Sequence, residues 1–315
     1  MPHPFRFGVS FHALSRDWRE EVRRIESLGY SSVFFPDHFG DQWDPTAAIA
    51  AIGAVTERLR VGTLVYDVDY RHPVVSAKQA ATIQLLTNGR HEFGFGAGWM
   101  ETDYVEAGIP YDRPGVRIER MEEALQIIRS MWTQERTSFE GKHYTIRDVA
   151  QAAAGQDPNA PPKILIGGGG RRVLSIAGRH ADIVGINPRM VAGKIVPETP
   201  ADLRPESVRE KVRWVREAAE QAGRDPDRIE FNALTFMVQV TDDPSGLRAA
   251  LSKSSGMTEA EVADCPIFLT GSASEIRERL EKRREETGIS YIVLAATAHD
   301  ALESFAEAVA PLAGK

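Results

Sequence analysis

The sequence predicts a single (β/α)₈ barrel, in which eight parallel strands form a closed sheet covered by helices. Short apolar runs rich in β-branched and aromatic residues alternate with segments of helical periodicity. Eight such runs, nearly continuous in apolar character, suit a closed parallel barrel better than an open sheet. The chain length of 315 residues fits one domain of this kind. An open doubly wound sheet is the alternative.

Each predicted strand is bounded by turn residues. The eight strands are Phe5–Ser10, Ser31–Pro36, Arg60–Tyr66, His91–Gly96, Lys163–Gly167, Ala181–Ile186, Ile229–Val240 and Ser290–Ala295. Between them, apolar residues three and four positions apart, as from Trp18 to Leu28, predict helices that pack one face on the sheet. Gly29 and Gly223 follow two such patterns, and Ser272 with Glu275 predicts a capping box.

Two segments, residues 133–162 and 187–205, lack periodicity and are rich in Pro, Gly and Ala. We interpret both as insertions at the rim of one domain that spans residues 1–315, rather than as a second domain. Loops of this kind often act as lids over a site.

Composition disfavours several classes of protein. Lys and Arg number 38 against 45 Asp and Glu, a formal charge of −7, so no excess of positive charge is available for nucleic-acid phosphates. Neither an apolar run of about 18 residues nor a signal-peptide pattern occurs, so we expect a soluble cytoplasmic protein without a membrane partner. The lone Cys265 cannot form an intramolecular disulfide and is typical of a small buried apolar residue.

Catalytic groups of a (β/α)₈ barrel follow the C-terminal ends of its strands. The second predicted strand runs into Asp37, His38 and Phe39, with Trp43 a few residues on. A histidine at this end, beside a carboxylate and near an aromatic ring, is a candidate proton donor. The alternative is that His38 only caps the strand or a nearby loop.

The fifth predicted strand opens into Gly167, Gly168, Gly169 and Gly170, followed by Arg171 and a helix. Such a junction presents unpaired backbone N–H groups and the positive end of a helix dipole, which together bind phosphate. The segment matches neither a P-loop nor a dinucleotide-binding fingerprint. A tight turn without a ligand is the alternative, although fewer glycines would suffice for it.

Metal and serine chemistry find little support. The eight His residues are scattered, without His-x-His or His-Glu-x-x-His, so we expect no metal site. No Gly-x-Ser-x-Gly occurs, which disfavours a serine hydrolase of the nucleophile-elbow type.

Four separated motifs resemble those of luciferase-like flavin monooxygenases and deazaflavin-dependent oxidoreductases. They are Ser32 to His38, Gly62 to Val65, Gly94 to Trp99 and Ile166 to Gly170. The segment from Asp37 to Phe39, followed by Trp43, is similar to the F420-dependent glucose-6-phosphate dehydrogenase branch. Together the motifs cover almost the whole chain in the expected order.

The resemblance implies roles for single residues. His38 and Trp43 would flank the redox ring, with Asp37 beside them. The Leu64–Val65 peptide would be a non-prolyl cis bond behind the ring. Ala97 and Gly98 would line the ring, and the glycine run with Arg171 would hold the phosphate of the cofactor.

This chain departs from the dehydrogenase branch at one position. That branch has a catalytic Glu where Trp99 stands, and no matching set of basic residues for a sugar phosphate is found. Glucose 6-phosphate is therefore not the expected substrate. We assign Trp99, with Phe11 and Tyr66, to an apolar or aromatic substrate pocket.

The leading hypothesis is an oxidoreductase that moves hydride between F420 and a small organic substrate, while His38 exchanges the accompanying proton. An FMN-dependent monooxygenase is the first alternative, because phosphate loops for FMN and F420 look alike. A non-catalytic cofactor-binding homologue is the second, and His38 with the intact glycine run argues against it. On the resemblance alone we expect a homodimer.

Overall fold

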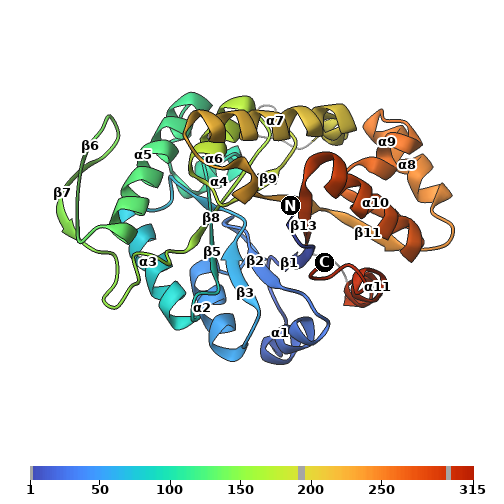
Figure 1. The fold of residues 1–315 in the computed structure, drawn as a ribbon, viewed down its shortest axis with the longest axis horizontal. Helices are drawn as coiled ribbons and strands as arrows, with labels where there is room; N and C mark the ends of the chain where they lie inside the picture. Colours follow the sequence, from blue (N-terminus) through green and yellow to red (C-terminus); the bar gives the residue numbers. More distant parts are fainter. Residues whose placement is uncertain (1–2, 191–195, 296–298) are drawn as a thin grey trace.

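The computed structural model describes residues 3–190, 196–295 and 299–315. It confirms the predicted (β/α)₈ barrel (Figure 1). The barrel strands are β1 (Arg6–Ser10), β2 (Ser32–Phe35), β3 (Arg60–Thr63), β5 (His91–Gly96), β8 (Lys163–Gly168), β9 (Ile183–Ile186), β10 (Glu230–Thr235) and β13 (Ile289–Ala295). Each strand pairs in parallel with the next of these along the chain, and pairing of β13 with β1 closes the sheet.

Helices surround the barrel, and their starts follow simple chemistry. They are α1 (Trp18–Ser27), α2 (Pro45–Val55), α3 (Pro73–Leu86), α4 (Glu101–Ala107), α5 (Pro114–Thr133), α6 (Arg171–His180), α7 (Pro205–Gln221), α8 (Ser245–Ser255), α9 (Glu259–Asp264), α10 (Ala273–Thr287) and α11 (His299–Val309). Four of them begin at a proline, whose fixed φ suits the first helical position. The predicted capping box of Ser272 and Glu275 is confirmed at the start of α10.

Two layers of apolar side chains fill the molecule. Inside the barrel, a small cluster of buried side chains includes Phe34, Leu165, Tyr291 and Val293. The larger core lies between the strands and the surrounding helices. Because each strand is covered on both faces, its residues read as a continuous apolar run.

The predicted strand Arg60–Tyr66 is wrong in its second half. β3 ends at Thr63, and a cis peptide joins Leu64 to Val65, as the family resemblance implied. The chain resumes as β4 (Tyr66–Asp67), which pairs with the end of β5. The third strand is therefore interrupted at the C-terminal end of the barrel.

The predicted strand Ile229–Val240 is also wrong as one element. β10 ends at Thr235, and the chain leaves the barrel at Phe236. β11 (Met237–Val240) then pairs with β12 (Phe268–Gly271), a strand that the sequence pattern did not predict. Continuous apolar character does not show where a strand changes its partner.

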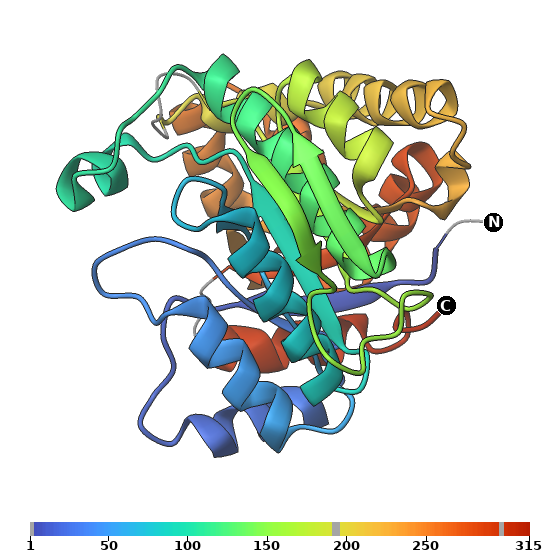
Figure 2. The same ribbon diagram turned by 90° about the vertical axis from the view of Figure 1, so that its left-hand side faces the viewer.

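The first insertion, residues 133–162, contains a hairpin of β6 (Arg136–Glu140) and β7 (Thr145–Ala150). The hairpin lies on the outer side of α5, away from the barrel (Figures 1 and 2). Both carboxylate oxygens of Glu123 on α5 accept backbone N–H groups of the hairpin turn. The second insertion follows β9 and includes a short 3₁₀ helix, Thr199–Leu203.

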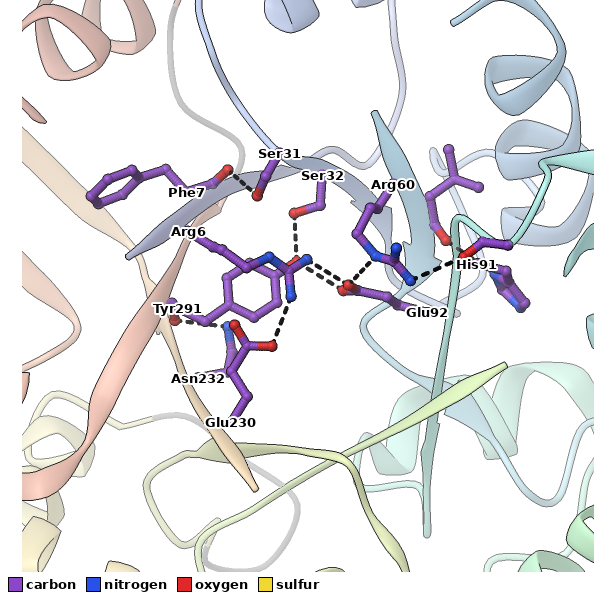
Figure 3. Close-up of polar contacts among 12 residues, drawn as sticks. Arg6, Phe7, Ser31, Ser32, Arg60, His91, Glu92, Glu230, Asn232 and Tyr291 are labelled. Atoms are coloured by element: carbon purple, nitrogen blue, oxygen red, sulfur yellow. Dashed lines mark hydrogen bonds and ion pairs between the residues drawn. The ribbon is translucent and has the colours of Figure 1, made fainter. Parts of the chain in front are cut away.

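A buried network of charges lies inside the N-terminal end of the barrel (Figure 3). Glu92, near the start of β5, has no exposed surface and accepts hydrogen bonds from Arg6 at 2.5 Å and Arg60 at 2.6 Å. Tyr291 donates to the second oxygen of Glu92 at 2.9 Å, and Arg6 also donates to Glu230 at 2.7 Å. Burial alone would raise the pKa of Glu92, but Arg6 and Arg60 outweigh it and lower that pKa to about 2.

We expect Glu92→Ala to lower the free energy of unfolding by about 3–5 kcal/mol, because it leaves Arg60 without its carboxylate partner and Arg6 with Glu230 alone. Urea and thermal denaturation measure this loss. As a control, Glu303→Ala removes a surface partner of Arg24 and should change stability by about 1 kcal/mol or less. Equal small losses in both variants would contradict the role given to Glu92.

The same network has a pH signature. The folded pKa of Glu92, about 2, lies below the unfolded value of about 4.3. The stability contributed by its charged form is therefore present above the unfolded pKa and is lost as pH falls through the folded pKa. Denaturation midpoints measured from pH 6 down to about pH 2 should fall less steeply for Glu92→Ala than for the unmodified chain.

Candidate active site

The residues singled out from the sequence lie at four strand ends that are neighbours around the barrel. β2 leads to His38, β3 to the Leu64–Val65 peptide, β5 to Trp99, and β8 to the glycine run. The strands pair in the order β2, β3, β5, β8. These segments therefore form one arc along the C-terminal mouth, where barrel enzymes carry their active sites.

His38 is held by a carboxylate from another element. Its Nδ1 lies 2.6 Å from Oδ2 of Asp103 on α4, whose side chain is only 7% exposed. Because a carboxylate oxygen accepts, Nδ1 carries the hydrogen and Nε2 is the position left for proton exchange. The imidazole stands edge-on to Trp99, with 5.6 Å between ring centroids.

Asp103 was not among the residues predicted from the sequence. Tyr70 also donates to its Oδ2, at 3.4 Å. A lone carboxylate on a short helix looks like a solvated surface residue until its partner is known.

Asp37 has contacts within the barrel wall. Its carboxylate forms a two-pronged ion pair with Arg71 and accepts the backbone N–H of Asp67 at 2.9 Å. The residue is 8% exposed. These bonds tie the end of β2 to β4, and a contact of Asp37 with a cofactor stays a prediction.

Gly98 occupies a position that no other residue fits. Its φ is +67°, and a Cβ there would lie 1.9 Å from the Tyr104 hydroxyl and 2.3 Å from Oδ2 of Asp67. Tyr104 donates to Asp67 at 2.7 Å. Burial raises the pKa of Asp67 to about 6. The Ala97–Gly98 backbone therefore lies directly on a buried acid, and a contact of Ala97 and Gly98 with the cofactor ring stays a prediction.

The cis peptide packs against the glycines of β5. A Cβ on Gly94 would lie 3.0 Å from the Val65 side chain, and one on Gly96 would lie 2.7 Å from it. Leu64 and Val65 are partly buried over the interior cluster of the barrel. Their side chains thus form the top of the barrel interior, between His38 and the glycine run.

Arg117, which the sequence pattern did not predict, fixes the next segment of the arc. It is 4% exposed and donates to the carbonyl oxygens of Ala97 at 3.1 Å and Gly98 at 3.4 Å. Its guanidinium lies 4.1 Å from the centre of the Tyr111 ring. The backbone beside Trp99 is therefore held from α5.

The other predicted aromatic residues lie deeper. Trp43 is half-buried and stacks on Phe35, with ring centroids 6.3 Å apart. Tyr66 is 1% exposed, and its hydroxyl bonds to Thr46 at 2.8 Å. Phe11 is 6% exposed. A cofactor contact of Trp43 and substrate contacts of Tyr66 and Phe11 stay predictions.

The glycine run ends at the start of α6. Gly170 precedes the helix and offers no side chain to cap it. Among the described residues, nothing accepts the backbone N–H groups of Arg171, Arg172 and Val173. Arg171 is exposed beside them. Three N–H donors without an acceptor among the described residues, at the positive end of a helix, suit a phosphate group.

The glycines of the run serve different purposes. A Cβ on Gly167 would lie 2.8 Å from the amide nitrogen of Asn187, and one on Gly169 would lie 2.3 Å from the backbone of Pro188. A Cβ on Gly168 would lie 2.6 Å from Val173. A Cβ on Gly170 would meet no atom within 4 Å. Only Gly170 therefore borders open space.

Two further observations concern the described residues as a whole. None of their helices is both long and apolar enough to cross a membrane. No three His, Cys, Asp or Glu side chains among them gather in a way that could hold a metal ion.

Comparison with known proteins gives relatives of two kinds. An F420-dependent glucose-6-phosphate dehydrogenase of Intrasporangium calvum is 34% identical over 178 residues, 53% of this chain and 52% of that one. An F420-dependent secondary alcohol dehydrogenase, solved with an F420–acetone adduct, has a TM-score of 0.75 at 20% identity, covering 98% of this chain and 99% of that one. The monooxygenase RslO1 from Streptomyces bottropensis has a TM-score of 0.73 at 21% identity, covering 97% and 99%.

The solved structures, at these identities, show a shared fold. The chain spans about half the length of the first curated relatives it matches, at 52% to 54%. A family model for luciferase-like monooxygenases matches residues 3–309, nearly the entire sequence. Together with the closed barrel and the motifs along its mouth, this match shows that the chain belongs to the luciferase-like monooxygenase family.

Proposed function

We propose that this protein is an F420-dependent oxidoreductase that moves hydride between the deazaflavin and a small organic substrate. The observation that carries the proposal is the arc of four neighbouring strand ends. The arc has an ionisable group at one end, His38, and an anion-binding helix start at the other, after Gly170. An elongated cofactor with a ring and a phosphate needs this spacing of contacts.

The residues present fit such a cofactor. The free N–H groups at the start of α6 would hold its phosphate, aided by Arg171. Leu64, Val65 and Ala97 would support the ring from the barrel interior. When bound, the deazaflavin supplies the hydride chemistry.

His38 would manage the proton that accompanies hydride transfer. Asp103 holds Nδ1 and sets the ring plane, so Nε2 is the atom that gives or takes the proton at the substrate. Trp99 beside it provides an apolar surface that excludes water. Asp103 acts through His38 and is a positioning residue.

The substrate we propose is a small organic molecule without a sugar phosphate. Several relatives are named for glucose 6-phosphate, but Trp99 and Phe39 give the region near His38 an aromatic surface. Phe39 is 44% exposed and packs on Tyr70. An exposed aromatic surface favours an apolar or aromatic substrate.

An FMN-dependent monooxygenase is the second candidate. The fold shared with the monooxygenase RslO1 favours it, since the helix start after Gly170 would bind the phosphate of FMN as well.

For either cofactor, we propose that the protein is a homodimer in the cytoplasm, without nucleic-acid or membrane partners. Val75, Leu85 and Leu86 of α3 expose apolar surface that suits a second copy, and sedimentation of the purified protein tests this.

The cofactor is identified by fluorescence titration. We expect F420 to bind more tightly than FMN, because the segment from Asp37 to Phe39, followed by Trp43, resembles the F420-dependent branch. The purified protein is titrated with each cofactor under the same conditions. Micromolar affinity for FMN without measurable F420 binding would overturn the deazaflavin assignment and favour the monooxygenase.

The phosphate site is tested at Gly170. Gly170→Val adds a Cβ that meets no protein atom within 4 Å and directs two methyl groups into the space before α6, so the melting temperature should change little. Affinity for FMN or F420 should fall about tenfold or more through loss of charge-assisted hydrogen bonds, whereas riboflavin affinity should not. Equal losses of affinity for FMN and riboflavin would show that the phosphate is not bound beside Gly170.

The role of His38 is tested by His38→Asn. Asparagine keeps hydrogen-bonding capacity but does not exchange a proton near neutral pH. Cofactor affinity should survive, while single-turnover hydride transfer to a substrate found in a panel of alcohols, aldehydes and enones falls about 10²–10⁴-fold. Asp103→Asn should also lower the rate of hydride transfer, but by a smaller factor than His38→Asn. A loss under about tenfold for His38→Asn would remove it from the mechanism.

A further inference from the structure

The segment Asn187–Arg189, directly after β9, forms the back wall of the glycine run. The backbone N–H of Asn187 donates to the carbonyl of Gly168 at 2.9 Å, and the Asn187 side chain packs on Gly167. The backbone of Pro188 and Arg189 lies so close to Gly169 that a Cβ there would be 2.3 to 2.4 Å away. The shape of the glycine run therefore depends on where this segment sits.

A buried lysine holds one end of the segment. Lys211, in the middle of α7, is 2% exposed, and its ammonium donates to the carbonyl oxygen of Asn187 at 2.9 Å. The same ammonium donates to Oδ2 of Asp202 at 2.5 Å. Burial keeps the pKa of Lys211 below its ordinary value even with Asp202 beside it.

Asp202 holds the other end of the segment. Its Oδ2 accepts the backbone N–H of Arg189 at 2.6 Å, in addition to the ammonium of Lys211. The Asp202 side chain is 30% exposed and lies in the 3₁₀ helix at Thr199–Leu203. One ion pair thus fastens both Asn187 and Arg189, on either side of the residue that packs on Gly169.

Burying an ammonium group is expensive, and an apolar side chain of similar length would fill this volume at lower cost. What an apolar side chain cannot do is bind the Asn187 carbonyl and orient the Asp202 carboxylate toward Arg189. The ion pair therefore gives positional control of a backbone segment, which favours a role in the site over a role in stability alone.

We propose that Lys211 and Asp202 are positioning residues that set the glycine run in the conformation that binds the cofactor phosphate. The inference rests on the proposed phosphate site at Gly170 and the start of α6. Neither side chain needs to touch the cofactor. Both act through Asn187–Arg189, whose backbone determines where the glycine run lies.

The test compares ligands with and without a phosphate. Dissociation constants of FMN and riboflavin, and of F420 and its phosphate-free ribityl deazaflavin, are measured by fluorescence for the unmodified chain, Lys211→Met and Asp202→Ala. We expect Lys211→Met to weaken FMN and F420 by about tenfold or more, because the Asn187 carbonyl loses its partner. The phosphate-free compounds should change by less than about twofold, because neither residue supports the ring.

Arg90→Met is the matched control. Arg90 is a partly buried cation that donates to the carbonyl oxygens of Gly53, Thr56, Leu59 and Thr87, at the N-terminal end of the barrel. Its loss should lower the melting temperature and leave the ratio of FMN to riboflavin affinity unchanged. That ratio separates a positioning role from a general loss of stability.

Asp202→Ala keeps the test decisive if Lys211→Met does not fold, because Asp202 is partly exposed and the change removes the acceptor of the Arg189 backbone N–H. Equal losses for the phosphate-bearing and phosphate-free ligands, or no loss for either, would overturn the role of Lys211 and Asp202. If the unmodified chain itself shows no preference for phosphate, the proposed site fails first and the inference with it.

Discussion

The buried carboxylate of Glu92 is the constraint on which the architecture depends. Its two oxygens take hydrogen bonds from Arg6 on β1, Arg60 on β3 and Tyr291 on β13. Of these strands only β3 is a neighbour of β5 in the sheet, so one carboxylate links β5 across the barrel interior to β1 and β13. A charge inside a barrel persists only where it is fully paired. The network therefore fixes the N-terminal ends of the strands, and the C-terminal ends are left to diverge into loops.

At the opposite end, close backbone approach replaces side-chain packing. Gly94 and Gly96 make room for Val65, Gly98 lies on Asp67 and Tyr104, and Gly169 lies on Pro188. Each of these glycines is required by a neighbour within the protein. Gly170 alone faces open space, so the run of four glycines serves both packing and access, and its length reflects two demands rather than one.

The sequence predicted most of the barrel because its strands are covered on both faces. His91–Gly96 has the predicted bounds at both ends. The β6–β7 hairpin was not predicted, because most of its side chains are exposed and carry no apolar run. The pattern also placed His38 and the glycine run after strand ends, where the structure has them. It did not identify Asp103, Arg117 or Lys211, because a charged residue on a helix reads as solvated until the fold supplies its distant partner.

Those distant partners determine how far the residues at the barrel mouth are ordered before a ligand binds. Asp103 orders the imidazole of His38 through Nδ1, and Lys211 with Asp202 orders the backbone beside the glycine run. Ordering these groups during folding removes an entropy cost that would otherwise fall on binding. The two ordered sites lie at opposite ends of the arc, with the cis peptide and Gly98 between them. In the function we propose, a cofactor that spans the arc meets a surface already fixed at both ends, so the orientation of its ring toward Nε2 of His38 would depend on where its phosphate is held.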